Sequence, residues 1–374
     1  MEDIPLHLVF VFLHIEDAIR VRVVSKWALE SVTEFQWLSM LPVFNVWKWR
    51  VCFPEAKALW YQGAAPLLYV PRRITHLRLE GVRVRECFFR ARLTSVRLLH
   101  CYGISPRCFT SALVTADFSG SRFPSWALAL LVSVKSLTVK ACKVRCKDIG
   151  TLVNLTSLDV SFTRIEHIPE LPNLKLLHAD SCPFIDTFAN LSGYALSYLC
   201  ASNISYIRGL PTGLTRVCLS GSDGDDMILE ALHGVKYVDL SYTKFHRYTP
   251  LQGASSIYAR GACIGGLRDL HELDFLDISE CSAVDPSVFS NIKCIKELVA
   301  RNCDWIDNWA LRWVKEVHVL TVTCPLLSFS GHFRQMCIRL KVKTLIACEC
   351  LQERLQGPYE MRLCGCAKKP FVNT

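Results

Sequence analysis

The sequence predicts an α/β solenoid, in which short repeats each add one strand to a parallel β-sheet. The first observation is an apolar pattern that recurs at a nearly constant interval along most of the 374 residues. The second is a small residue that closes each copy of the pattern, where the chain has to turn. The third is that 51% of the residues are apolar, enough for a large buried core and too many for a disordered chain.

Residues 1–40 differ from the remainder of the chain, because their apolar residues recur at the spacing of a helix. Asp17 precedes Ile19, as the cap of a helix would. The apolar run from Leu6 to Ile15 does not match a secretory signal, because acidic residues precede it and no small-residue cleavage site follows. We predict a few short helices packed on one another.

The order of motifs in this segment resembles an F-box. Ile4-Pro5 stands for the Leu-Pro opening, and Val24-Ser25-Lys26-Trp27 resembles the Val-small-Lys-x-Trp run with its Trp one place early. Trp37-Leu38 inverts the late Leu-Trp pair of the family. The alternative role is an amino-terminal cap that only covers the end of the solenoid. The resemblance implies docking on the Skp-type adaptor of a cullin-RING ubiquitin ligase through Ile4, Pro5, Leu8, Phe12, Leu13, Val24 and Trp27.

Residues 41–73 are predicted to form a connector and amino-terminal cap. They carry Trp47, Trp49 and Trp60 together with several prolines. Such a composition is typical of packed chain and not of a flexible linker.

Residues 74–350 hold the repeats, each following the template apolar-x-x-apolar-x-apolar-x-x-small. Twelve steps carry the first position from Ile74 to Val314, a mean of 20 residues. The second and third apolar positions lie two residues apart, as one face of a strand requires. One strand cannot bury that face alone, so parallel strands stack into a continuous core. The first positions are Ile74, Leu93, Leu113, Val134, Leu155, Leu174, Leu196, Leu214, Val235, Ala254, Leu273, Ile295, Val314 and Val342.

The small position accounts for part of the count of 19 cysteines. Only compact residues that bond backbone groups fit where the chain turns inward after the strand. These cysteines are expected to be buried thiols in a reducing compartment. Ile204, Ala262 and Val322 depart from the pattern. The predicted small residues are Cys101, Ser121, Cys142, Thr163, Cys182, Ser222, Thr243, Cys281, Cys303 and Cys350.

The repeated template resembles the cysteine-containing type of leucine-rich repeat over residues 74–350. The resemblance implies a horseshoe whose concave face carries the parallel sheet, and a role in binding another protein on that face. Residues 351–374 are then a carboxy-terminal cap or tail.

Partner binding is expected on the outward side chains of the concave strands. Exposed tyrosine and arginine together are typical of protein-binding hot spots. The predicted partner site comprises Tyr198, Arg216, Tyr237, Tyr258, Arg260, Phe275 and Arg301. A basic alternative lies on the first two repeats, at His76, Arg78, Ser95 and Arg97.

Two further groups of residues have both a structural and a functional interpretation. The row Asp117, Asp159, Asp239 and Asp277 faces outward, yet an Asp at this place is also common repeat consensus. The tryptophans Trp305, Trp309 and Trp313 recur at the four-residue spacing of one helix face, and are expected in the core on the convex side.

Several function classes are not favoured by the sequence. No phosphate-binding glycine loop, His-Glu-x-x-His or Gly-x-Ser-x-Gly motif is present, so no catalytic residue is expected. The balance of 43 basic against 34 acidic residues is mild for a nucleic-acid protein, and no apolar run is long enough to cross a membrane. No cofactor or metal is expected, with zinc left as an alternative at Cys348, Cys350, Cys364 and Cys366.

The leading hypothesis is therefore a substrate-recognition subunit of a cullin-RING ubiquitin ligase, acting in the cytoplasm or nucleus. The F-box-like segment would hold the adaptor and cullin, and the concave face would select the protein to be modified. The alternatives are an interaction scaffold without a ligase link, and a ribonucleoprotein scaffold in which arginines contact phosphate and aromatic rings stack on bases.

Overall fold

The computed structural model describes residues 56–62, 70, 73–84, 93–106, 112–224, 226–243, 251, 253–262, 267, 270–281, 286–303, 305, 310–323, 331–347 and 360–363. The F-box-like segment, Trp309 and the four carboxy-terminal cysteines lie outside these ranges. The chain divides into two compact units, Met1–His178 and Ala179–Thr374. Among the described helices, none combines the length and hydropathy that a bilayer crossing requires.

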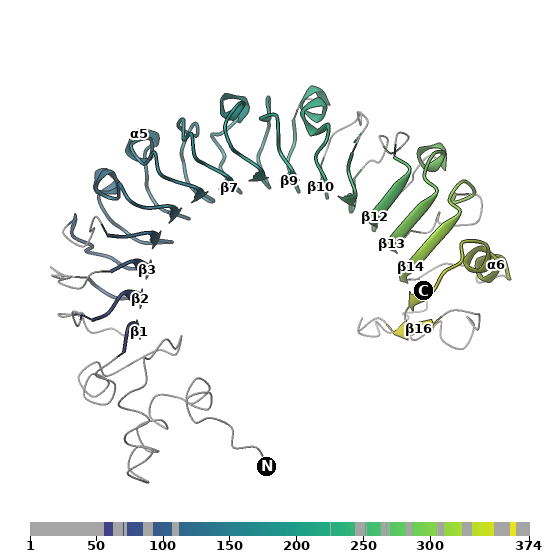
Figure 1. Ribbon diagram of the computed structural model, residues 1–374, viewed down its shortest axis with the longest axis horizontal. Coiled ribbons are helices and arrows are strands. Elements are labelled where there is room, and N and C mark those ends of the chain that lie inside the picture. The colour runs from purple at the N-terminus through teal and green to yellow at the C-terminus, as the bar shows by residue number, and fades with distance from the viewer. Residues whose placement is uncertain are drawn as a thin grey trace, which may run out of the picture. The chain divides into compact units, whose positions relative to one another are not determined.

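The first unit is a parallel sheet in which each strand pairs with the next strand along the chain (Figure 1). The 3₁₀ helix η2 (Ser125–Leu130) and helix α5 (Cys146–Ile149) lie on the return side of their repeats, away from the strands. The strands are β1 (Ala58–Gln62), β2 (His76–Glu80), β3 (Ser95–Leu99), β4 (Thr115–Asp117), β5 (Ser136–Thr138), β6 (Ser157–Asp159) and β7 (Leu176–His178).

The second unit repeats this arrangement, again with every pairing parallel and sequential. Its return segments carry η3 (Ala189–Leu191), η4 (Asp226–Leu232), η5 (Pro286–Phe289) and α6 (Gly331–Arg339). The strands are β8 (Tyr198–Cys200), β9 (Arg216–Cys218), β10 (Tyr237–Asp239), β11 (Ser256–Tyr258), β12 (Glu272–Asp277), β13 (Cys294–Arg301), β14 (Glu316–Thr323), β15 (Thr344–Ala347) and β16 (Glu360–Leu363).

Each unit is therefore a parallel β-solenoid, as the repeat pattern predicts. Two strands fall outside the predicted repeat range: β1 lies within the segment expected to be a connector, and β16 lies within the expected carboxy-terminal cap. β1 pairs with β2, and β16 pairs with β15. Without these two strands, one edge of β2 and one edge of β15 would have unpaired backbone groups.

The predicted register is confirmed in all but one of the repeats. The first positions from Ile74 to Ile295 are buried, and the second positions pair across neighbouring strands, as Leu137 does with Leu158. The exception is the repeat predicted to begin at Val314. Here Val317 pairs with Ile295 and Leu320 with Leu298, so the pattern begins three residues later. Val322 then pairs with Ala300, at an apolar position, and is no departure from the template.

The turn after each strand has a conformational requirement that the sequence analysis missed. The residue just before the small position has a positive φ in repeat after repeat, for example +66° at Gly120 and +56° at Ala141. Glycine adopts this conformation without strain, and at Gly120 a Cβ atom would also meet the His100 ring. The recurrence of Gly81, Gly120, Gly221 and Gly261 at one template position was the signal that pointed to it.

The predicted role of the small residues is confirmed where the structure describes them. The Cys142 thiol donates to the carbonyl of Phe118 at 2.9 Å, and the Ser222 hydroxyl donates to Ala201 O at 2.7 Å. Both side chains are buried. Burial raises the pKa of Cys142 from 9.0 to about 11, because the thiolate would lose its hydration. These cysteines are structural thiols that hold neighbouring turns together.

We expect the thiol of Cys142 to react much more slowly with an alkylating reagent than that of Cys146 in the folded protein. The Cys142 thiol is buried and its thiolate is disfavoured, whereas Cys146 is partly exposed four residues along the same repeat. Timed alkylation followed by peptide mass spectrometry measures both rates in one sample. Equal rates before denaturation would contradict the buried position of Cys142.

The tryptophan prediction is wrong for Trp313, a residue that is 47% exposed instead of lying in the core. It precedes Val314 in a turn and not in a helix, so the four-residue spacing does not place it on a helix face. Trp305 does pack inward: its ring stacks near Phe289 at 6.5 Å, and its Nε1 donates to Cys281 O at 2.7 Å.

Candidate protein-interaction surface

Strand alternation in the second unit arranges outward side chains in two columns. The middle residue of each short strand, such as Val217 or Val238, is buried, so its two neighbours point away from the core. The first column contains Tyr198, Arg216, Tyr237, Ser256 and Phe275, in the order of strands β8 to β12. The second contains Cys200, Cys218, Asp239, Tyr258 and Asp277.

Five of these side chains form a continuous stack, which we call the aromatic ladder: Tyr198, Arg216, Tyr237, Tyr258 and Phe275. The guanidinium carbon of Arg216 lies 5.8 Å from the ring centroid of Tyr198 and 4.7 Å from that of Tyr237. The rings of Tyr237 and Tyr258 are 5.0 Å apart, and those of Tyr258 and Phe275 are 4.5 Å apart and stacked. Sequence reasoning selected all five residues, and the structure brings them together.

The ladder is held together by contacts between its side chains and is only partly exposed to solvent. Its four rings are half-buried, while Arg216 is exposed. Burial, together with the neighbouring Tyr258, raises the pKa of Tyr237 to about 12, and burial raises the pKa of Tyr198 as well. Both hydroxyls are therefore neutral at physiological pH. Aromatic rings held by their neighbours offer contact area at little cost in conformational entropy.

Arg260 and Arg301, the other two predicted site residues, lie at the strand ends and are not part of the ladder. Arg260 binds Glu280 at 2.5 Å, and Glu280 also accepts the Tyr242 hydroxyl at 2.7 Å. This pairing holds the pKa of the Glu280 carboxyl below its usual range. Arg301 is exposed at the end of β13, one repeat beyond Ser279. Arg260 is therefore already ion-paired with Glu280 in the absence of a ligand.

The row of aspartates has a structural role in every described copy. Each carboxylate accepts the backbone N–H two residues further along the chain, at 3.0 Å for Asp117, 2.9 Å for Asp159, 3.0 Å for Asp239 and 2.8 Å for Asp277. The bond satisfies a backbone donor at the point where the strand ends. Of the two interpretations open from the sequence, the structure supports the repeat role.

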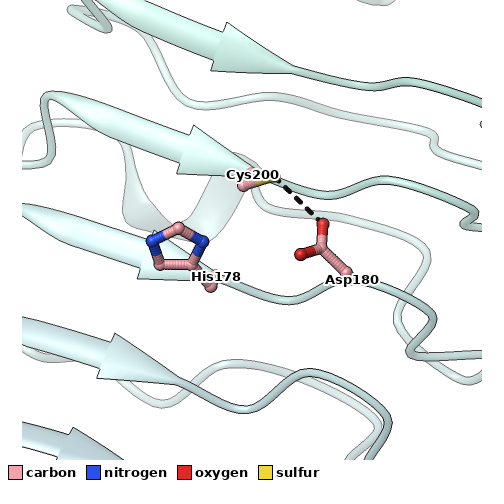
Figure 2. Close-up of side chains that lie close together, drawn as sticks. All are labelled: His178, Asp180 and Cys200. Carbon is pink, nitrogen blue, oxygen red and sulfur yellow. Dashed lines mark hydrogen bonds between the residues drawn. The ribbon is translucent and has the colours of Figure 1, made fainter.

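A polar cluster beside the ladder was missed by the sequence analysis (Figure 2). The Cys200 thiol donates to Asp180 Oδ1 at 3.1 Å, and the same carboxylate oxygen accepts the backbone N–H of Ser202 at 2.9 Å. The neighbouring Cys218 thiol lies 3.2 Å from the Ser202 hydroxyl. Hydrogen bonding to Cys218 and burial raise the pKa of Cys200, so this thiol is neutral. The signal in the sequence was a pair of cysteines at one outward template position.

The basic alternative on the first unit is partly neutralised by its own acidic neighbours. Arg78 forms an ion pair with Glu80 at 3.4 Å, and Arg97 forms one with Asp117 at 3.3 Å. The Arg78 guanidinium also lies 3.9 Å from the ring centroid of Trp60. Arginines already engaged in this way are poorly placed to neutralise phosphates.

Comparisons with known proteins find similarity among solved structures. No family profile matches the sequence, and no curated protein matches it. Among solved structures, the chain is similar to an internalin from Listeria monocytogenes at 13% identity, with a TM-score of 0.40, covering 97% of this chain and 94% of that one. It is also similar to a leucine-rich-repeat protein of Leptospira interrogans at 14% identity, with a TM-score of 0.42, covering 91% and 87%.

Proposed function

We propose that this protein binds another protein through the strand face of its second unit, with the aromatic ladder at the centre of the binding site. The observation that carries the proposal is the stack of half-buried rings around Arg216. Tyrosine and arginine dominate binding energy at protein interfaces, where they lie near the middle of the buried patch. A partly exposed aromatic patch of this kind is typical of a protein-binding site.

A protein partner is favoured over single-stranded nucleic acid by the state of the rings and by charge. Bases stack on aromatic faces that are open, whereas Tyr258 already has a ring on each side. The adjacent column carries the carboxylates of Asp239 and Asp277, which repel phosphate. The ribonucleoprotein alternative therefore loses its main support on this face.

The test is affinity purification of the full chain from a nuclease-treated extract, with a Tyr258→Ala variant in parallel. A protein partner is expected to co-purify with the wild type and to be depleted with the variant. Tyr206→Ala is a matched control, because Tyr206 is exposed outside the strands of the same unit. Partners that survive Tyr258→Ala unchanged, or that vanish on nuclease treatment, would count against the proposal.

In its finer form, the proposal makes the protein the substrate-recognition subunit of a cullin-RING ubiquitin ligase. The support is the F-box-like order of residues in 1–40 followed by repeats. Catalysis then belongs to other subunits, and the strand face selects the protein to be modified. The coarser alternative is a binding scaffold in which residues 1–40 only cap the solenoid.

We expect the double variant Pro5→Ser, Leu8→Gln to lose capture of a Skp-type adaptor while the wild type binds it. Apolar residues of the first helix would supply the docking contacts, and polar side chains remove them. A pull-down with purified adaptor measures the loss, with unchanged circular dichroism as the folding control. Tyr258→Ala should still bind the adaptor. Absence of binding by the wild type, or full binding by the double variant, would leave the scaffold as the better account.

A further inference from the structure

A group of potential metal ligands lies at the start of strands β13 and β14, away from the aromatic ladder. Cys294 and Glu316 are directly paired residues of these neighbouring strands. His318 lies two residues beyond Glu316, on the other side of the buried Val317, so the two side chains share one face of the strand. The Cys294 sulfur, a Glu316 oxygen and a His318 ring nitrogen all lie within 4.8 Å of one another.

We propose that Cys294, Glu316 and His318 form a binding site for one zinc ion, with a water molecule as the fourth ligand. Their distances are close to those of a zinc site. The His318 Nε2 and Glu316 Oε1 atoms are 3.2 Å apart. Zinc bonds of about 2.0 to 2.1 Å to nitrogen and oxygen in tetrahedral geometry require a separation of about 3.3 Å. That edge of the tetrahedron is already formed.

The sulfur needs at most a small movement to complete the site. A Zn–S bond of about 2.3 Å places sulfur about 3.6 Å from the other ligand atoms. Because all three ligand atoms lie within 4.8 Å of one another, the sulfur has at most about 1.2 Å to close. Rotation of the Cys294 side chain about its Cα–Cβ bond moves the sulfur through such distances without disturbing the strand.

The donor set selects the class of metal. Thiolate, imidazole and carboxylate together suit zinc and similar transition-metal ions, whereas calcium and magnesium take oxygen ligands alone. Zinc replaces the proton of the Cys294 thiol, and that proton leaves to solvent. His318 and Glu316 are 30% and 33% exposed, so an ion and its water ligand can reach them.

Both acidic and basic side chains surround the site, because Lys296 and Lys343 act electrostatically on Cys294 together with the carboxylates of Glu272 and Glu316. Glu272 is the paired neighbour of Cys294 on the opposite side, on β12, and adds a second carboxylate to the row. The amine of Lys296 is held by Asp274 at 2.6 Å, so its charge is balanced nearby. A simpler account is that His318 and Glu316 form only an ion pair, which leaves Cys294 without a part in the cluster. The two accounts differ in whether the thiol binds the metal.

The test is titration of the full, chelator-treated chain with Co²⁺ and then with Zn²⁺ in the presence of a competing chelator. One metal per chain is expected, with the intense near-ultraviolet absorption of a cobalt–thiolate bond. Cys294→Ser should abolish that absorption, and His318→Gln should weaken binding at least about tenfold. Zinc should also raise the melting temperature of the wild type more than that of His318→Gln at the same zinc concentration, because the ion joins neighbouring strands.

Two controls keep the outcome unambiguous. Lys296→Gln alters a neighbouring exposed side chain that supplies no ligand and should bind zinc as the wild type does. Cys364→Ser with Cys366→Ser removes the other candidate thiols suggested by the sequence. Loss of the cobalt–thiolate absorption in that double variant and not in Cys294→Ser would overturn the proposal. So would failure of the wild type to bind either metal.

Discussion

Replacing Tyr258 with alanine is expected to weaken partner binding by about 2 kcal/mol or more, a loss of roughly 30-fold in affinity. Tyr258 lies between two other rings of the aromatic ladder, with Tyr237 at 5.0 Å and Phe275 at 4.5 Å. The substitution removes the contact area of the Tyr258 ring. It also removes the ring that Tyr237 and Phe275 pack against, so these two rings are less well ordered for binding. Isothermal titration calorimetry with the partner found by affinity purification measures the change.

The same substitution should lower the free energy of unfolding by about 1 to 2 kcal/mol, because aromatic pairs contribute about 0.5 to 1.5 kcal/mol each. Tyr258→Phe separates the two effects, since it keeps both ring contacts and removes only the hydroxyl. We expect Tyr258→Phe to restore stability and most of the affinity. Wild-type affinity in a folded Tyr258→Ala protein would move the binding site elsewhere on the molecule.

Alkaline pH is expected to destabilise the first unit through Cys142 by about 2 to 3 kcal/mol. The pKa of this thiol is about 11 in the folded chain, against an ordinary 9.0. Below pH 9 both states keep the proton and the full stability is present. Between pH 9 and about 11 the unfolded chain ionises first, so stability falls as pH rises through this window. Urea unfolding at a series of pH values measures the slope.

Cys142→Ser is the matched variant for this prediction. A serine already occupies the equivalent small position at Ser121 and Ser222, where its hydroxyl bonds a backbone carbonyl as the thiol does. The hydroxyl does not ionise in this range, so the variant should lose less stability between pH 9 and 11 than the wild type. Identical slopes for the two proteins would show that Cys142 ionises as easily folded as unfolded.

The register of the repeats was predictable because it depends on apolar residues alone. Burial of Leu137, Leu158 and their counterparts is fixed by strand alternation, and a shift of one residue would expose them all. The error at Val314 arose because valines at 314, 317, 319 and 322 allow the template to begin at either Val314 or Val317. The structure resolves the choice by pairing Val317 with Ile295, which no single repeat reveals.

The ladder was predictable for the same reason, since outward positions follow once the inward ones are known. Stacking was not, because the sequence gives a column for Tyr258 but not the rotamer that brings its ring onto Phe275. The proximity of Cys294, Glu316 and His318, which could together hold a metal ion, was also not predictable from the sequence. Its members are brought together by longer strands at this end of the sheet, where residues before the template's first position join the pairing.

The spacing between paired residues varies while the pairing itself does not. Leu199 pairs with Val217, 18 residues on, and Leu298 pairs with Leu320, 22 residues on. The return segments absorb this difference. Insertions and deletions there should be tolerated without moving any side chain of the strand face, whereas the face can change only by substitution. Length and binding specificity are thus free to diverge independently during the evolution of such a chain.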